Sequence, residues 1–323
     1  MNVPLQQTRA WKKLQHELGE TTFFKETEDF IFLAILKKTR LGNYFYLPYG
    51  PVLKHKTAAK TAYKALEDLA RENNVSFIRI EPQDPKTASY FLKLPNLRKS
   101  TDLNPAHTWV LDLAIPKEQL ISNFSQGTRT RYNQASKKGL TVTLSKNPDD
   151  IKELVRLQHK LAHEKGISTF SEVYLKAELQ QSFASLYLVH YRQSESETNS
   201  AVKQKTDDKI IAASLFFDHD GVRYYMQSAS DYEYHRLPAT VALLAAAIFD
   251  AKAKGLKYFD FWGIAPDDAS KNHPWAGFTK FKKSFGGEAK SYVGTYDLIL
   301  NRPKYTLYNL ARKLNRFLRK LKA

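Results

Sequence analysis

Two stretches of the sequence repeat one order of secondary structure, and this repeat constrains the fold more than any other feature. Residues 44–82 give a strand, a polar turn, a helix, and a second strand reached at Phe77, 33 residues after the first begins. Residues 224–262 give the same order, with Tyr258 lying 34 residues after the start. In each case a further strand, at 30–38 or 210–217, precedes the stretch and pairs with its first strand. Two copies of a ββαβ module would explain the length, and chance alternation within an α/β chain is the alternative.

The length of 323 residues suits two domains of about 150 residues each. Helix and strand signals alternate throughout, which predicts a mixed α and β fold. We place the first domain at residues 1–147 and the second at 148–295, with a C-terminal helix at 296–323 completing the first. Proline and glycine punctuation predicts a single helix over 116–136. The polar stretch 192–209 predicts a flexible hairpin loop.

Charge and composition narrow the class of partner. The formal charge is +17, an excess that favours a polyanion such as nucleic acid, a phosphorylated substrate or an anionic membrane, although a solubility role is the simpler alternative. The absence of cysteine excludes disulfides, thiolate metal sites and cysteine nucleophiles. The longest apolar run, 241–249, falls far short of the roughly 20 residues of a membrane span, and no signal peptide is visible. We therefore expect a cytoplasmic protein.

The C-terminal segment concentrates this positive charge. Between Arg302 and Lys322 there are eight Lys or Arg residues and no acid. Apolar residues recur there at helical spacing, which predicts an amphipathic basic helix with one broad apolar face: Leu307, Leu310, Leu314, Phe317, Leu318 and Leu321. That face either packs on the first domain or contacts a membrane, and the basic side attracts tRNA or anionic lipid.

The order of two strands, a helix and a strand resembles the acetyltransferase fold of the GNAT type. Acetyl-CoA enzymes of that fold place a glycine-rich turn before the helix to hold a pyrophosphate. The corresponding stretch, HRLPATV at 235–241, has no glycine, and its proline removes an amide, so CoA binding is disfavoured. Phosphate-loop, HExxH and GxSxG motifs are missing as well. We expect no cofactor and no metal, since His159 and His163 lack a third ligand at a suitable spacing.

Several longer segments, taken in order, resemble the Fem family of non-ribosomal peptidyltransferases, which extend peptidoglycan side chains with aminoacyl-tRNA. The resemblance covers most of the chain, and the last two segments are the most specific. The segments are PLQQTRAWKKLQHELG, YLPYGPVL, IRIEP, HTWVLDL, RTRYNQASKKGLTV, DKIIAASLFF, YYMQSASDYEYHRLPATVALLAAAIFDAKAKGLKYFDFWGI and WAGFTKFKKSFGGEAKSYVGTYDL. The family fold is two tandem GNAT-like domains. No long heptad segment is present, so the chain resembles members without a coiled-coil, tRNA-binding arm.

The resemblance implies an activity, its partners and several site residues. The activity is transfer of an amino acid from aminoacyl-tRNA to the amine of a UDP- or lipid-linked muropeptide precursor, by a monomer that touches the inner face of the membrane at most peripherally. The family places a Phe–Lys pair at Phe281 and Lys282, where the lysine serves the acyl group and the last tRNA nucleotide. The family also binds the phosphates of the acceptor with a lysine and an arginine. The nearest matches are Arg236 and either Lys37 or Lys38; only one of these neighbouring strand lysines can face the cleft, and we choose Lys38.

The residues themselves support some of these roles and leave others open. A fixed cation at Lys282 can stabilise the oxyanion of ester aminolysis. The acceptor amine must lose a proton, and Asp260 and the leaving oxygen are the candidate acceptors; Asp260 is equally suited to hold the ammonium. Tyr49, Tyr225 and Trp262 either line the cleft or belong to the core. Phe285 is expected in the core, and the other lysines of residues 275–288 in solvent. The alternatives in function are an acyl-CoA N-acyltransferase and a non-catalytic protein that binds RNA or membrane.

Overall fold

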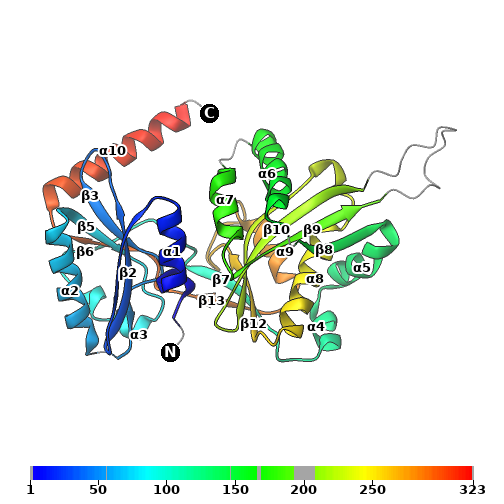
Figure 1. Cartoon of the computed structure of the whole chain (residues 1–323), viewed down its shortest axis with the longest axis horizontal. Coiled ribbons are helices and arrows are strands. Elements are labelled where there is room, and N and C mark those ends of the chain that lie inside the picture. Colours follow the sequence, from blue (N-terminus) through cyan, green and yellow to red (C-terminus); the bar gives the residue numbers. More distant parts are fainter. Residues whose placement is uncertain (1–2, 56, 146, 166–168, 193–207, 322–323) are drawn as a thin grey trace. The chain divides into compact units, whose positions relative to one another are not determined.

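The computed structural model describes residues 3–55, 57–145, 147–165, 169–192 and 208–321 (Figure 1). The chain divides into two compact units. The first joins Met1–Ala106 to Ser291–Ala323, and the second is His107–Lys290. Among the described residues, no helix has both the length and the apolar composition needed to cross a bilayer.

The first unit is built on a mixed sheet with the strand order β1-β2-β3-β5-β14-β6, in which β4 pairs with β2. Its strands are β1 (Thr21–Glu26), β2 (Phe30–Lys37), β3 (Asn43–Leu47), β4 (Val52–Leu53), β5 (Val75–Ile80), β6 (Leu97–Lys99) and β14 (Tyr296–Ile299). Its helices are η1 (Leu5–Gln7), α1 (Arg9–Glu17), α2 (Ala58–Glu72), α3 (Pro85–Ala88), η2 (Phe91–Lys93) and α10 (Arg302–Leu321). The last two elements of the chain therefore complete the fold that the first hundred residues begin.

The core of the first unit lies between the sheet and α2. Ala62, Leu66 and Ala70 are fully buried on one face of α2, and the two alanines let the helix lie close to the strands. Strands β3 and β5 run parallel on either side of this crossover, and Tyr44 pairs with Phe77. The spacing of 33 residues in the sequence is therefore the actual register of the first repeat.

The second unit carries a sheet with the order β13-β7-β12-β11-β10-β9-β8. Its strands are β7 (His107–Asp112), β8 (Leu140–Ser145), β9 (Ala184–Tyr191), β10 (Lys209–His219), β11 (Val222–Ser230), β12 (Tyr258–Gly263) and β13 (Glu288–Ser291). Its helices are α4 (Lys117–Asn123), α5 (Gln126–Ala135), η3 (Ser136–Lys138), η4 (Pro148–Asp150), α6 (Ile151–Lys165), α7 (Glu172–Leu179), η6 (Tyr232–Tyr234), α8 (Ala239–Ala253) and α9 (Ala276–Lys283).

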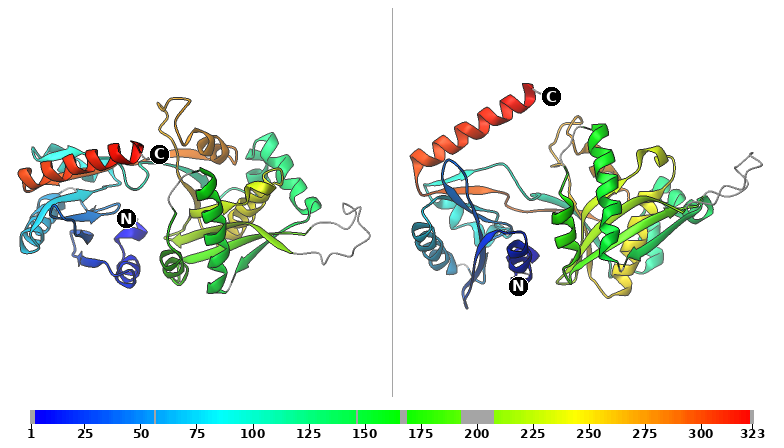
Figure 2. Two further views of the ribbon diagram at one scale, coloured as in Figure 1. Left: turned by 90° about the horizontal axis from the view of Figure 1, so that it is seen from above. Right: turned by 45° about the horizontal axis from the view of Figure 1, so that its top comes forward.

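Helices cover both faces of this second sheet. Helix α8 packs on one face together with α5, and α6 packs on the other against β10 and β11 (Figure 2). As a result seven consecutive residues in the middle of β10 are buried. Helix α8 is itself apolar nearly all round, because it lies between the sheet and α5.

The predicted fold class is confirmed: each unit contains two antiparallel strands followed by a helix and a parallel strand. In the second unit β11 and β12 run parallel across α8, with Tyr224 opposite Asp260. Among the described residues no helix exceeds the 20 residues of α10, so this part of the chain has no coiled-coil arm. Residues 193–207, within the predicted hairpin loop, lie outside the described residues.

The compact units divide the chain elsewhere than at the expected boundary between residues 147 and 148. Residues 107–147 belong to the second unit. The reason is strand pairing between distant segments: β7 pairs with β12, and β8 pairs with β9. The C-terminal residues join the first unit, as expected, but with a strand as well as a helix, since β14 pairs with both β5 and β6.

Candidate active site

The end of β12 forms an irregular turn that prepares the candidate site. The pairing of β12 with β7 shifts register between Asp260 and Gly263. Trp262 adopts a left-handed backbone conformation with φ of 66°, which is rare for a bulky residue and is found at functional sites. The Trp262 N–H donates to the Asp260 carboxylate at 2.7 Å, which holds the turn in place. The backbone strain of Trp262 is thus stabilised by a buried acid.

Helix α9 supplies the lysine that faces this turn. The Lys282 ammonium donates to the Gly263 carbonyl oxygen at 2.5 Å. One turn earlier, the Thr279 hydroxyl accepts a hydrogen bond from the Ala265 N–H at 2.8 Å. Two contacts on one helix face therefore fix α9 to the segment that follows β12, and they hold Lys282 at the bulge.

The far end of α9 is fixed by aromatic packing and a tight turn. Phe285 is fully buried, which confirms its expected core role, and the Phe281 ring meets it edge to face at 5.4 Å. Gly287 has φ of 93°, and a side chain at this position would collide with the backbone carbonyl of Val110. The glycine pair is therefore a turn that lets the chain pass close to β7.

Burial brings the two ionisable groups of the site closer in proton affinity. Burial raises the pKa of Asp260 to about 6, although the Trp262 N–H and the nearby Lys282 charge oppose this rise. Burial lowers the pKa of Lys282 to about 8, and the negative charge of Asp260 limits the decrease. Perturbed pairs of this kind favour acid–base or charge-stabilising chemistry. Near neutral pH the site holds an anion beside a cation.

Tyr224 is a member of this site that sequence reasoning missed. It lies opposite Asp260 in the parallel register, and its ring meets the Trp262 indole edge to face at 6.0 Å. Burial, followed by the Asp260 charge, raises the pKa of its phenol well above the usual range. Tyr225, the residue predicted from the sequence, instead stacks on Phe216 at 5.5 Å within the core cluster of α8.

A basic cavity of about 440 Å³ lies beside α9 in the same unit. Three of its lining residues are cations: Arg131, Lys138 and Arg236. Phe281 lines it too, whereas the next residue, Lys282, contacts Gly263. The predicted residues Phe281 and Arg236 thus line one cavity, and Phe281 is the sequence neighbour of Lys282.

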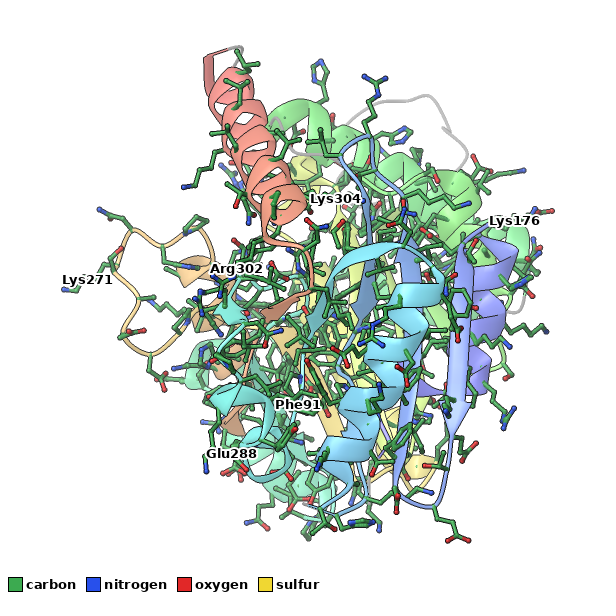
Figure 3. All side chains as sticks on the ribbon, turned by 90° about the vertical axis from the view of Figure 1, so that its left-hand side faces the viewer. Phe91, Lys176, Lys271, Glu288, Arg302 and Lys304 are labelled. Carbon is green, nitrogen blue, oxygen red and sulfur yellow. The ribbon has the colours of Figure 1, made fainter. Side chains whose placement is uncertain are left out.

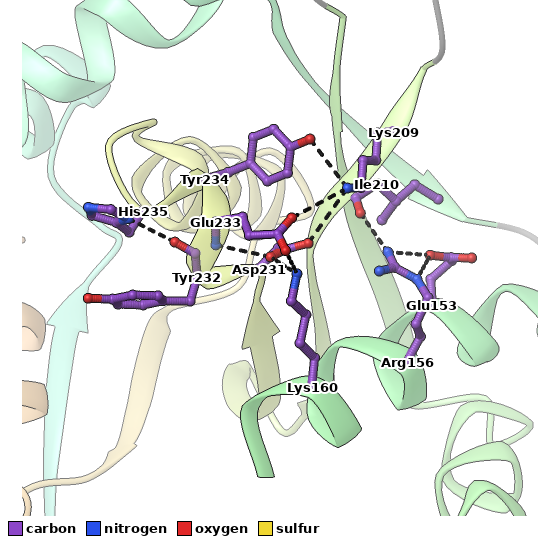
Figure 4. Close-up of polar contacts among 10 residues, drawn as sticks. All are labelled: Glu153, Arg156, Lys160, Lys209, Ile210, Asp231, Tyr232, Glu233, Tyr234 and His235. Atoms are coloured by element: carbon purple, nitrogen blue, oxygen red, sulfur yellow. Dashed lines mark hydrogen bonds and ion pairs between the residues drawn. The ribbon is translucent and has the colours of Figure 1, made fainter. Parts of the chain in front are cut away.

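An ion-pair cluster holds the loop that carries Arg236 (Figure 4). Lys160, from α6, contacts the buried Asp231 carboxylate at 2.6 Å and Glu233 at 2.8 Å. The Asp231 carboxylate also accepts the Glu233 N–H at 3.1 Å, and so caps η6. His235 then hydrogen-bonds the Tyr232 carbonyl at 2.8 Å. These contacts fix the chain entering α8 without the glycine-rich turn of CoA enzymes.

Two predicted residues, Lys38 and Tyr49, belong to the first unit. Lys37 forms an ion pair with Glu20, while Lys38 is exposed just after β2. Tyr49 is buried with φ of 52°, and its hydroxyl donates to the Pro105 carbonyl at 3.1 Å. Roles for both residues in substrate binding stay predictions.

The remaining lysines and aromatics around α9 face solvent. Lys283 is 41% exposed, forms an ion pair with Asp267 at 3.6 Å and lies over the Trp109 ring. Trp275 and Phe278 are exposed large rings near the start of the helix. Among the described residues, no three His, Asp or Glu side chains gather into a metal-binding cluster.

Comparison with known proteins points to one family. Residues 176–313 match the model of the FemAB family. Aminoacyltransferase FemA of Staphylococcus epidermidis is 25% identical over 125 residues, which cover 39% of this chain and 30% of FemA. The matched segment thus spans less than a third of that relative. A lipid II:glycine glycyltransferase of Staphylococcus saprophyticus is 24% identical, with 95% of this chain and 89% of the relative covered.

Solved structures share the fold across nearly the whole chain. The crystal structure of FemX aligns with a TM-score of 0.81 at 18% identity, covering 95% of this chain and 94% of FemX. L-PGS from Bacillus licheniformis aligns with a TM-score of 0.59 at 13% identity, covering 98% and 99%. At such identities the likeness concerns the fold alone.

Proposed function

We propose that this chain, a member of the Fem family, transfers an amino acid from aminoacyl-tRNA to the side-chain amine of a peptidoglycan precursor peptide. The observation that carries the proposal is a half-buried Lys282 fixed on the Gly263 carbonyl, at the same turn that the buried Asp260 holds through the Trp262 N–H. A cavity lined by three cations lies in the same unit. Relatives named aminoacyltransferase and lipid II:glycine glycyltransferase support the same chemistry. The reaction would run in the cytoplasm, where charged tRNA is present.

In the proposed reaction the acceptor amine attacks the ester carbonyl of aminoacyl-tRNA. A C–N bond forms, and the carbonyl oxygen carries the negative charge of the tetrahedral intermediate. The C–O bond to the ribose then breaks, and the leaving oxygen takes a proton. The ester is already activated, so the reaction needs no ATP. Lys282, held at 2.5 Å from the Gly263 carbonyl, supplies a cation whose position is fixed before reaction.

Asp260 has two roles in the proposal, and both follow from its burial. A lysine-like acceptor amine has a pKa near 10.4, so it arrives protonated. The Asp260 carboxylate can bind this ammonium or accept its proton, and burial raises the pKa of Asp260 to about 6, which brings it closer to that of the amine. The carboxylate also keeps Lys282 charged. Tyr224 and Trp262 border the acid and would exclude water from it.

The cavity would hold phosphate groups. Arg236, which the family resemblance assigns to the phosphates of the acceptor, lines it with Arg131 and Lys138. Each guanidinium group can donate two parallel hydrogen bonds to the oxygens of a phosphate. The third cation adds positive charge that balances a second phosphate. We therefore propose that this cavity takes the pyrophosphate of the precursor. Lys38 stays a prediction for the same role, and Tyr49, Tyr225 and Trp262 stay predictions for acceptor contacts.

The deciding experiment supplies the protein with a charged tRNA pool and a muropeptide precursor, and follows the precursor by mass spectrometry. We expect a gain of one amino-acid residue that depends on intact tRNA and is indifferent to acetyl-CoA and ATP. Treating the charged pool with RNase beforehand should abolish the gain. Product formation that persists after RNase, or that requires acetyl-CoA, would contradict the proposal.

The rate of transfer should depend on pH in a bell shape. Transfer needs Asp260 ionised and Lys282 protonated, so kcat/KM should rise as pH passes about 6 and fall as it passes about 8. Because the two groups interact, the apparent pKa values of the two limbs describe the pair and not either residue alone. Asp260→Asn should remove the acid limb and move the alkaline limb to lower pH, because the carboxylate raises the pKa of Lys282. An unchanged alkaline limb in this variant would show that the Asp260 charge does not affect the pKa that governs this limb.

Removing cavity cations should weaken binding of the acceptor more than binding of tRNA. Arg131→Ala and Lys138→Ala should each raise the KM for the precursor about tenfold, since each loses a charge-assisted contact. The matched control is Arg129→Ala, which lies on the same helix as Arg131 but outside the cavity lining. A loss of tRNA affinity with a lower salt dependence, and no change for the precursor, would instead assign the cavity to RNA.

A further inference from the structure

Helix α10 carries an apolar stripe that the described residues of the first unit leave exposed. The exposed fractions of its leucines are 50% for Leu307, 64% for Leu310, 57% for Leu314 and 45% for Leu318. At 3.6 residues per turn these positions fall on one side of the helix. The helix is amphipathic, as the sequence predicts, but its leucine stripe points toward solvent and not toward the sheet. The side chains of Phe317 and Leu321 lie outside the described part of the helix.

The opposite side of α10 anchors the helix to the sheet. The rings of Tyr305 and Tyr308 contact the Phe77 ring at 5.1 and 5.0 Å. The Tyr305 hydroxyl donates to Asp297 at 3.0 Å, and Arg312 lies over the Tyr308 ring at 5.9 Å. The helix is thus held by its tyrosine side. The leucine stripe is not the side that packs, and Figure 2 shows the red C-terminal end pointing away from the strands of this unit.

Cations flank the stripe. By helical geometry Lys304 lies along one border of the leucines and Lys313 along the other. Arg302 and Lys304 mark the first turn (Figure 3). The segment from Arg302 to Lys322 holds eight Lys or Arg residues and no acid. An apolar stripe bordered by cations is the pattern of helices that lie in the plane of a membrane surface.

We propose that α10 docks this unit onto an anionic lipid surface, with the leucine stripe at the boundary of headgroups and acyl chains. Lipid phosphates neutralise the flanking cations, and the acyl region takes up the leucines. RNA would satisfy the cations but leave four leucines in water. A second copy of the helix would cover the leucines but set cations against cations, since the segment has no acid to pair with them. The lipid surface alone satisfies both features. This inference is independent of the transfer reaction.

The test uses the full-length protein and vesicles of two compositions: phosphatidylglycerol mixed with phosphatidylcholine, and phosphatidylcholine alone. The wild type should co-sediment with the anionic vesicles and not with the neutral ones. Leu310→Gln/Leu314→Gln should weaken this binding on the order of 100-fold, since two large side chains lose their apolar environment while glutamine keeps helix propensity. Leu103→Gln/Leu144→Gln, two leucines exposed elsewhere, is the matched control and should bind like the wild type.

A charge variant keeps the test decisive if the double substitution alters folding. Lys313→Glu, an exposed position on the stripe border, should weaken vesicle binding about tenfold and reduce its salt dependence. Transfer to a soluble acceptor should be unchanged in all these variants. Equal vesicle binding by the leucine variant and the wild type would overturn the proposal. So would a dimer that the leucine variant abolishes, or a loss of tRNA affinity in place of lipid affinity.

Discussion

Replacing Lys282 by alanine should lower kcat for transfer on the order of 10²–10³-fold, or roughly 3–4 kcal/mol, with little change in KM for either substrate. The reason is that a cation acting on a developing oxyanion stabilises the transition state more than the bound ester. The ammonium is fixed in advance by its contact with the Gly263 carbonyl. Single-turnover transfer from charged tRNA by the folded variant measures the effect directly.

Two further substitutions show whether the position of the charge matters. Lys282→Arg should restore only part of the rate, because a planar guanidinium cannot place its charge where the ammonium stood. Lys283→Ala is the neighbouring control and should be mild, since Lys283 is 41% exposed and its ion pair with Asp267 lies at the surface. A Lys282→Ala rate close to wild type, or greater damage from Lys283→Ala, would remove Lys282 from the mechanism.

The largest effect on stability is expected at Asp297. Its two carboxylate oxygens accept from Arg79 at 2.7 and 2.8 Å, and both side chains are 1% exposed. Asp297→Ala leaves a buried guanidinium without its counter-charge and should cost about 3–5 kcal/mol of unfolding free energy. Urea unfolding, followed by a probe within the first unit, would measure this loss.

Two comparison variants separate the buried charge from general damage. Arg79→Met/Asp297→Leu removes both charges and should be less destabilising than Asp297→Ala alone. Asp68→Ala breaks exposed ion pairs to Lys64 and Arg71 and should leave the unfolding midpoint nearly unchanged. An Asp297→Ala protein as stable as the Asp68→Ala protein would mean that the buried pair contributes nothing.

The crossovers could be read from the sequence because they are local. Each strand–helix–strand unit spans about forty residues, and helix length fixes where the second strand must begin. The spacing from Tyr44 to Phe77 therefore matched the register. The expected domain boundary did not match the compact units, because β7 pairs with β12 from about 150 residues further along the chain. No local sequence pattern indicates a strand partner so far along the chain.

Two smaller features could not be predicted from the sequence for a similar reason. The helix predicted over 116–136 is two helices, because the Ser125 hydroxyl accepts the Thr128 N–H and starts α5 afresh. The choice between Tyr224 and Tyr225 depends on which face of β11 meets Asp260, and alternation alone gives two answers. The parallel register with β12 places Tyr224 opposite Asp260.

The cavity cations were visible in the sequence but not recognisable. Arg131 and Lys138 are seven residues apart, a spacing that brings side chains to one helix face. Nothing local distinguishes them from other surface cations, and their meeting with Arg236 depends on the packing of α5 against α8. By contrast, Lys282 lay in a segment whose family resemblance singled it out.

The place of β14 in the first sheet has a consequence for synthesis on the ribosome. This strand is internal, between β5 and β6, yet it is translated after every residue of the second unit. The second unit is contiguous and emerges complete while the first still has open edges at β5 and β6. Until residues 296–299 leave the exit tunnel, β5 has one open edge and β6 has no strand partner, and both are accessible to chaperones and proteases. Translation that stops before that point yields a polypeptide that contains every residue of the second unit but leaves the first sheet with an open edge at β5.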